Sequence, residues 1–230
     1  MNFKPILDPN FSTIINLFNG NNIPYWICHG TLLGIVRDNK LIEWDHDIDI
    51  AVWADVVKKE YITNLMSKAN FKLREGFMVK NDIISFNKDG GRIVDINFYK
   101  KIKSQTNQRE MAYVNWFIPK NILMKLVDAI SISDKYNGKF KRLIKFFGFM
   151  QKLMLKLKKS LINNNFFYKE AGYTEPLELV QNIKKIKFHG LEIKVPSQAE
   201  KYLEYIYGSD WKTPKKNYSW LKDSPSTIIR

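Results

Sequence analysis

The chain has 230 residues, 45% of them apolar, which is ample for one domain with a substantial core. Its 37 Lys and Arg outnumber its 23 Asp and Glu, and the net charge of +14 favours anionic partners: nucleotides, acidic glycans, membrane surfaces or nucleic acid. A single cysteine excludes an internal disulfide and a cysteine-rich zinc site. Because the sequence shows no signal-peptide pattern and no apolar run of about 20 residues, we expect a cytoplasmic location, either free or at the inner face of a membrane.

The first forty residues predict a helix, a strand and a second helix. Residues 11–19 have the apolar spacing of a helix, and residues 25–28 form an apolar, strand-like run. Gly30-Thr31-Leu32-Leu33-Gly34 then begins a short helical pattern that ends at Arg37. Backbone N–H groups at a glycine-containing helix start favour an anion, and the guanidinium of Arg37 suits a phosphate. The alternative is an ordinary strand–turn–helix whose glycines serve the backbone alone.

Three aspartates alternate with other residues in the next predicted strand, residues 44–50. Strand alternation puts Asp45, Asp47 and Asp49 on one face. Carboxylates side by side repel each other, so we expect a cation between them. Mg²⁺ takes carboxylate, water and phosphate oxygens, and Mn²⁺ is a possible substitute. A solvated, acidic strand end is the alternative for an isolated D-x-D, but the preceding glycine-containing helix start favours a metal and phosphate site.

The following segment predicts a helix and a set of strands. Residues 54–69 are amphipathic, and strand-like stretches follow at 71–73 with 77–79, at 83–86 and at 93–98. In the last of these, Asp95 is a third candidate carboxylate, on a face with Ile93 and Asn97. Residues 100–110 are polar and are predicted to form a loop. A helix crossover followed by antiparallel hairpins predicts an α+β fold, with a small twisted mixed sheet flanked by helices.

Residues 135–169 contain ten Lys and Arg and no Asp or Glu, interleaved with Phe, Leu and Met. This pattern predicts a basic amphipathic helical insertion after a helix at 120–129. Three interpretations stay open: a helix that packs its apolar stripe on the domain, a contact with a membrane surface, and nucleic-acid binding. The last is the least favoured.

The C-terminal part predicts a short helix at 175–182, a hairpin at 184–195 with its turn at His189, and a further helix. Ser197 and Glu200 have the spacing of a capping box for that helix. We expect one domain over residues 1–230. Its core would span about 10–130, the basic segment about 135–169, and a C-terminal lobe with the hairpin and helix about 170–230.

These motifs resemble the LicD/fukutin family of the nucleotidyltransferase-fold superfamily. The matching stretches are G-T-L-L-G with Arg37, W-D-x-D-I-D-I at 44–50, V-D-I-N-F at 94–98, and Y-G-S-D-W-K-T-P at 207–214. His46 stands where the family often has an Asp, and Glu43 where it often has a Pro. These departures affect the expected substrate more than the expected chemistry.

The resemblance implies a metal-dependent phosphotransferase. Asp47 and Asp49 would hold the metal, and Asp95 would complete its site or accept a proton. The groups that would bind substrate are Gly30, Thr31 and Arg37, which would hold phosphate oxygens, and Asp45, which would lie in an outer shell or contact the acceptor. The donor would be a CDP-activated alcohol, carrying phosphocholine, glycerol phosphate or ribitol phosphate. The acceptor would be a sugar hydroxyl of a cell-surface glycan (lipopolysaccharide, capsule or teichoic acid), free or lipid-linked, and CMP would be released.

Two other functions stay open from the sequence. One is transfer of the nucleotide itself to a small molecule or protein, on the same fold. The other is a non-catalytic basic adaptor that binds membranes or nucleic acid.

Overall fold

The computed structural model describes residues 7–77, 80–104, 108–133, 136 and 138–229. Met78 and Val79 of the strand-like stretch predicted at 77–79, and Lys135 of the basic segment, lie outside these residues. In the described part of the chain, no helix is both long enough and apolar enough to cross a bilayer.

The N-terminal part follows the predicted order of helix, strand, helix and strand. Its elements are α1 (Pro9–Gly20), β1 (Trp26–Ile27), α2 (His29–Asp38), β2 (Asp47–Trp53) and α3 (Lys59–Lys68). Asp8 caps α1 by accepting the backbone N–H groups of Asn10 and Phe11. The strand β2 begins at Asp47, so Trp44, Asp45 and His46 precede it rather than belong to it.

The sheet is mixed, as predicted. Its strands run in the order β1-β2-β5-β6-β7-β10, and β4, with β3 beyond it, also pairs with β5. The bounds are β3 (Lys72–Leu73), β4 (Ile83–Asn87), β5 (Ile93–Lys103), β6 (Glu110–Pro119), β7 (Tyr168–Pro176) and β10 (Thr227–Ile229), with a 3₁₀ turn η1 (Glu75–Phe77). Among the described residues, β2 and β5 are the one parallel pair in this sheet, and its other pairings are antiparallel.

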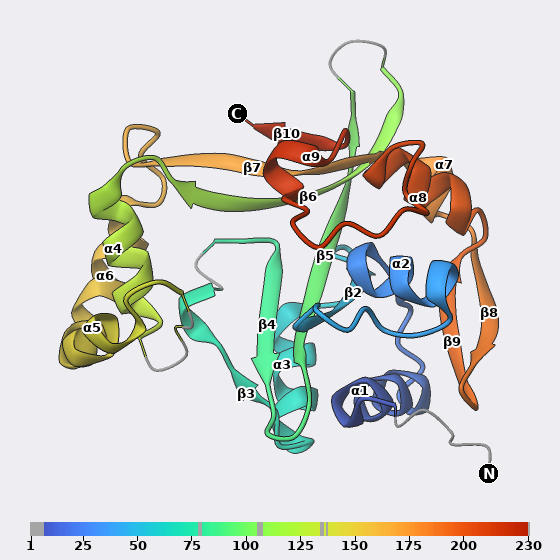
Figure 1. The fold of residues 1–230 in the computed structure, drawn as a ribbon, viewed down its shortest axis with the longest axis horizontal. Coiled ribbons are helices and arrows are strands. Elements are labelled where there is room, and N and C mark those ends of the chain that lie inside the picture. Colours follow the sequence, from blue (N-terminus) through green and yellow to red (C-terminus); the bar gives the residue numbers. More distant parts are fainter. Residues whose placement is uncertain (1–6, 78–79, 105–107, 134–135, 137, 230) are drawn as a thin grey trace.

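The strand β5 joins two parts of the sheet. Its first half pairs with β2 and β4, and Lys100–Lys103 pairs with β6. The prediction of a loop at 100–110 is therefore wrong for residues 100–103. These residues form backbone hydrogen bonds with β6, and a polar local pattern gives no sign of such pairing. In Figure 1, β6 and β7 run above the end of β4 and across the upper part of β5.

Helices α4, α5 and α6 gather at one end of the molecule (Figure 1). This end comprises α4 (Ile122–Ser131), α5 (Lys141–Phe146), the 3₁₀ turn η2 (Phe147–Met150) and α6 (Gln151–Leu161). The remaining elements are α7 (Leu177–Val180), the hairpin β8 (Ile183–Phe188) and β9 (Leu191–Pro196), α8 (Ala199–Tyr207) and α9 (Trp220–Asp223).

Two local predictions in the C-terminal part are wrong. The helix predicted at 175–182 is reduced to α7, because residues up to Pro176 pair with β6. The capping box fails because α8 begins at Ala199, after Gln198, and has no side-chain cap. The Ser197 N–H instead donates to the Asn182 carbonyl at 2.8 Å, which ties it to the start of the hairpin.

The main core lies between the sheet and helices α1, α2, α3 and α8. Cys28, the single cysteine, is buried there. Side chains that are fully buried include Phe11, Phe18, Ile48, Ile50, Val94, Ile96 and Tyr202. The helical end has two small clusters of its own, around Met124 and Ile130.

Candidate active site

Four aspartates on and beside the sheet line one cavity of about 440 Å³, which a fifth, Asp128 of α4, also lines. We call it the acidic cavity. Asp47 and Asp49 lie on β2 and Asp95 on β5, and Asp49 is the register partner of Asp95 on the adjacent parallel strand. Asp45 comes from the turn before β2. Since Ile48 and Ile50, which alternate with the aspartates, are fully buried, the carboxylates point away from the core into the cavity.

Asp45, Asp47 and Asp95 have raised pKa values, so these three carboxyl groups hold protons more tightly than free aspartates do. Burial, and then the charges of Asp49, Asp45 and Asp95, raise the pKa of Asp47 to about 10. Burial raises the pKa of Asp95 to about 7, against the opposing effect of the Ser85 hydroxyl, which donates to its Oδ1 at 2.5 Å. Burial also raises the pKa of Asp45. Buried carboxyl groups this close together favour the binding of either protons or a cation.

The residues present suit a hard divalent ion. Four carboxyl groups share one cavity, and their mutual repulsion is what a cation would relieve. Among the described residues, no three His, Cys, Asp or Glu side chains stand ready-arranged as a metal site. Mg²⁺ commonly takes only one or two carboxylates and fills its shell with waters and substrate phosphates, so a complete protein cage is not required.

The two glycines of G-T-L-L-G have different tasks. A Cβ on Gly30 would stand 2.5 Å from Asp45 Oδ2 and 3.8 Å from Asp49 Oδ2, so Gly30 belongs to the acidic cavity. A Cβ on Gly34 would stand 2.5 Å from the Lys40 carbonyl oxygen, so that glycine permits the returning loop to pack on α2.

Thr31 lies beside the site without lining its cavity. Its hydroxyl is buried and accepts the backbone N–H of Asp49 at 2.8 Å. This contact fixes the start of α2 against the strand that carries the aspartates.

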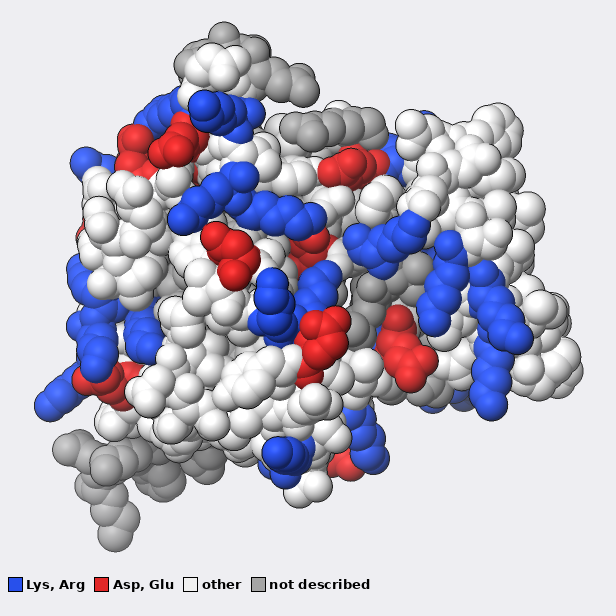
Figure 2. All heavy atoms as spheres, turned by 180° about the vertical axis from the view of Figure 1, so that it is seen from behind, with Lys and Arg blue, Asp and Glu red and all other residues white. Residues whose placement is uncertain are grey.

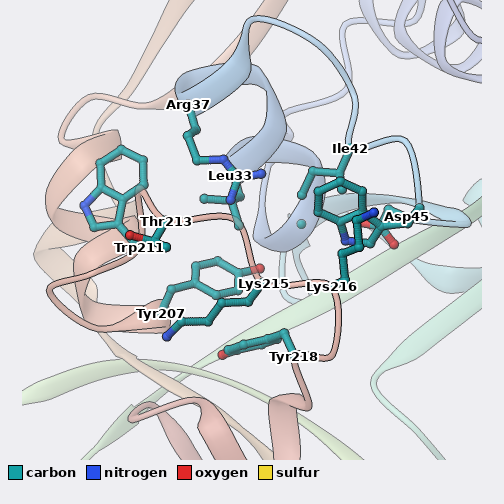
Figure 3. Close-up of a pocket in the computed structure, with 12 residues that line it drawn as sticks. Leu33, Arg37, Ile42, Asp45, Tyr207, Trp211, Thr213, Lys215, Lys216 and Tyr218 are labelled. Atoms are coloured by element: carbon teal, nitrogen blue, oxygen red, sulfur yellow. The ribbon is translucent and has the colours of Figure 1, made fainter.

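Arg37 lies in a neighbouring pocket rather than in the acidic cavity. That pocket, of about 240 Å³, is shown in Figure 3 and shares Gly30 and Asp45 with the acidic cavity. The guanidinium is paired with Asp38, at 3.0 Å from Nε to Oδ1 and 2.7 Å from Nη2 to Oδ2. The C-terminal segment supplies two more cations to the pocket, Lys215 and Lys216.

A buried polar chain, which no local sequence pattern indicates, lies behind the aspartates. The Tyr99 hydroxyl donates to Glu175 Oε1 at 2.7 Å, so it accepts from His29 Nε2 at 2.8 Å. The other ring nitrogen, His29 Nδ1, is 3.8 Å from Asp49 Oδ1. Glu175 is fully buried. Its place next to the site depends on β7 pairing with β6, for which the sequence offers no local signal.

A second missed pair lies on the helical wall of the acidic cavity. Lys158 of α6 is 5% exposed, and its Nζ lies 3.3 Å from Asp128 Oδ1 and 3.0 Å from the Gly76 carbonyl oxygen. Both Lys158 and Asp128 line the cavity. In sequence, Lys158 looks like the other lysines of the basic segment, and only its burial separates it from them.

Aromatic side chains from distant parts of the chain close the cavity. Trp116, Tyr173 and Trp220 come from β6, β7 and α9, with ring centroids 4.9 to 5.6 Å apart. These mutually packed rings form one wall of the acidic cavity.

The family model LicD/FKTN/FKRP, nucleotidyltransferase domain, matches residues 22–146. The chain therefore belongs to this family of transferases. The matched range contains Trp116 and the predicted site residues Gly30, Thr31, Arg37, Asp45, Asp47, Asp49 and Asp95. It ends before Lys158, Tyr173 and Trp220.

Other comparisons add little. None of the curated proteins matches the chain. The solution structure of the antibiotic-resistance factor ANT(2'')-Ia is similar at a TM-score of 0.32 and 9% identity, over 68% of this chain and 90% of that one. A likeness this weak carries no argument about function.

Proposed function

We propose that the protein is a metal-dependent phosphotransferase. It would move a phospho-alcohol from a CDP-activated donor to a sugar hydroxyl of a cell-surface glycan and release CMP. The observation that carries this proposal is the alignment of Asp49 with Asp95 across two parallel strands, in a chain of the LicD/FKTN/FKRP family. The cytoplasmic location expected from the sequence stays a prediction.

Asp47 and Asp49 would hold Mg²⁺ or Mn²⁺, and Asp95 would complete the site. When bound, such an ion neutralises negative charge on the donor phosphates and on the departing CMP. This assignment is supported by the shared cavity and by the raised pKa values of Asp47 and Asp95.

The reaction needs a proton acceptor for the attacking hydroxyl. In the proposed step, the sugar oxygen forms a bond to the phosphorus that carries the alcohol, and the bond from that phosphorus to the CMP oxygen breaks. The hydroxyl proton passes to a carboxylate. Asp95 is a candidate for this role as the alternative to completing the metal site, because its pKa of about 7 in the metal-free chain lies close to neutral pH, where a general base works best.

Cationic groups at two sides of the aspartates would hold the rest of the donor. Lys158 faces the acidic cavity from α6 and would contact a phosphate. Arg37, Lys215 and Lys216 line the adjoining pocket, where an anionic part of the nucleotide would fit. Since Gly30 and Asp45 line both cavities, an elongated donor can extend from one into the other.

The test is to incubate the protein with Mg²⁺ and CDP-choline, CDP-glycerol or CDP-ribitol, with a glycan acceptor, and to measure CMP and phosphorylated acceptor. We expect CMP from one of these donors, and none from the Asp47→Asn, Asp49→Asn double variant. Asp55→Asn is the matched control, because Asp55 is exposed and outside the cavity.

Two results would overturn the proposal. Pyrophosphate formed from CTP, with no CMP from any CDP-alcohol, would indicate nucleotide transfer instead. CMP release that persists in the double variant would show that the aspartates do not carry the reaction.

A further inference from the structure

The segment α5–η2–α6 has two apolar stripes, and only one of them is buried. Ile144, Phe147, Met150 and Met154 pack against Ala129 and Ile130 of α4. This packing agrees with the first interpretation of the basic segment, a helix that packs an apolar stripe on the domain. Leu155 and Leu161 of α6 pack in the neighbouring cluster around Met124. Other apolar side chains of the segment stay exposed to solvent.

The second stripe is exposed. Its members follow one another at intervals of three or four residues, the spacing of an apolar helix face, from Phe140 just before α5 through η2 to Leu157 of α6. They are Phe140 (77% exposed), Leu143 (54%), Phe146 (73%), Phe149 (79%), Leu153 (58%) and Leu157 (37%). Single exposed apolar residues are common, but six at helical spacing form a contact surface. We call these six residues the exposed stripe.

The exposed stripe is accompanied by positive charge alone. Residues 138–169 contain no Asp or Glu. The exposed cations of the two helices are Lys141, Arg142, Lys145, Lys152, Lys156 and Lys159. None of these six pairs with a carboxylate of the described part of the chain. At the right of Figure 2, where this end of the molecule lies, white surface is bordered by Lys and Arg.

We propose that the exposed stripe docks on an anionic lipid bilayer. Helices that lie in a membrane interface combine an apolar face of Phe and Leu with flanking Lys and Arg. The aromatic and aliphatic side chains would enter the acyl boundary, and the long lysine side chains would reach the anionic headgroups. Nucleic acid would use the cations but leaves six exposed apolar side chains unexplained.

The same helix connects this surface to the acidic cavity. Lys158 on α6 faces the cavity, while Leu153 and Leu157 on α6 are exposed. Docking would therefore hold the cavity next to the bilayer, where a lipid-linked acceptor is found. This last step depends on the proposed function, whereas docking itself does not.

Co-sedimentation of the full chain with vesicles tests the proposal. We expect binding to phosphatidylcholine vesicles that contain phosphatidylglycerol, weakened by salt, and little binding to pure phosphatidylcholine. The double change Phe146→Ser and Phe149→Ser should lower the partition coefficient by at least about tenfold. The triple change Lys145→Gln, Lys152→Gln and Lys156→Gln should lower it by a similar factor and remove the salt dependence.

The matched controls lie elsewhere on the surface. Val56→Ser with Tyr61→Ser removes two exposed apolar side chains near and on α3, and Lys72→Gln, Lys184→Gln and Lys187→Gln remove three exposed cations. Both should leave vesicle binding unchanged. Circular dichroism checks that each variant folds.

Three outcomes would contradict the proposal. One is equal vesicle binding by the stripe variants and the controls. Another is no vesicle binding together with self-association that Phe146→Ser and Phe149→Ser abolish, which would make the surface an interface between copies. The third is binding to single-stranded or duplex DNA with no binding to vesicles. CMP release in solution is unaffected by any of these, so the proposed function is tested separately.

Discussion

Asp49 on β2 and Asp95 on β5 are direct register partners across the only parallel strand pair that the described residues form, and both carboxyl groups face one cavity. The adjoining residues Ile50 and Ile96 are also paired and fully buried. Burial of these isoleucines in the core fixes the register of β2 and β5, and that register places the two carboxyl groups side by side on the opposite face of the sheet.

The stability of the metal-free protein should fall as pH rises. The pKa values of Asp47 and Asp95 in the folded chain, about 10 and about 7, lie above the ordinary value of 3.8, so the folded state binds these protons more tightly. Their contribution is fully present below about pH 4 and is lost as pH rises through the folded values. Thermal unfolding in the presence of a chelator should show a lower midpoint at about pH 8 than at about pH 5.

The Asp47→Asn variant is the control for that experiment. The substitution removes the carboxyl group whose pKa is raised to about 10, together with its repulsion of the neighbouring carboxylates. The unfolding midpoint of this variant should therefore depend less on pH than that of the wild type. If the unfolding midpoint of Asp47→Asn depends on pH as strongly as that of the wild type, the aspartates of the acidic cavity are not the cause of the pH dependence.

The two glycines of α2 should respond differently to alanine. At Gly30 the new Cβ meets a side-chain carboxylate, which can rotate, so Gly30→Ala should reduce turnover with little effect on unfolding. At Gly34 it meets the backbone of Lys40 and Ile42, at 2.5 and 2.9 Å. Gly34→Ala should lower the free energy of unfolding by about 1–3 kcal/mol, measured by urea titration. Equal effects of both changes would contradict this division of roles.

Removing the Tyr99 hydroxyl should destabilise the fold. Tyr99→Phe leaves Glu175 Oε1 without its closest donor in a fully buried position. We expect a loss of about 1–3 kcal/mol in the free energy of unfolding. Tyr61→Phe, at an exposed position, should cost nothing measurable. If both variants unfold alike, the buried polar chain behind Asp49 has no energetic importance.

Replacing Lys158 should weaken turnover of the donor substrate, whereas replacing Lys156, two residues earlier on the same helix, should not. Lys158→Met removes a cation from the acidic cavity, and we expect kcat/KM for the CDP-alcohol to fall about tenfold or more. Lys156→Met changes an exposed lysine on the same helix and should leave kcat/KM for a soluble acceptor unchanged. Similar kinetics for the two variants would place the donor phosphates away from α6.

The sequence predicted the parts of the fold that follow from local patterns. Alternation placed Asp47 and Asp49 opposite Ile48 and Ile50, and the apolar run around Asp95 marked the neighbouring strand. These predictions succeed because a one-residue change of register would bury the charges and expose the core.

Features that depend on distant contacts were not predictable. Glu175 reaches His29 only because β7 pairs with β6, and Lys158 enters the cavity only because α6 packs on α4. Arg37 was expected beside the phosphates, but it lies in the adjoining pocket and is paired with Asp38. Side-chain burial decides each of these positions, and it arises from tertiary packing that no local pattern contains.

Binding of Mn²⁺, followed by electron paramagnetic resonance in the presence of CMP, tests most directly whether carboxylates of β2 and β5 hold one divalent ion. The wild-type chain should bind Mn²⁺. Asp49→Asn and Asp95→Asn should each weaken binding at least about tenfold, whereas Asp89→Asn, at an exposed turn, should not. Equal Mn²⁺ affinity in the wild type, Asp49→Asn and Asp95→Asn would contradict the account.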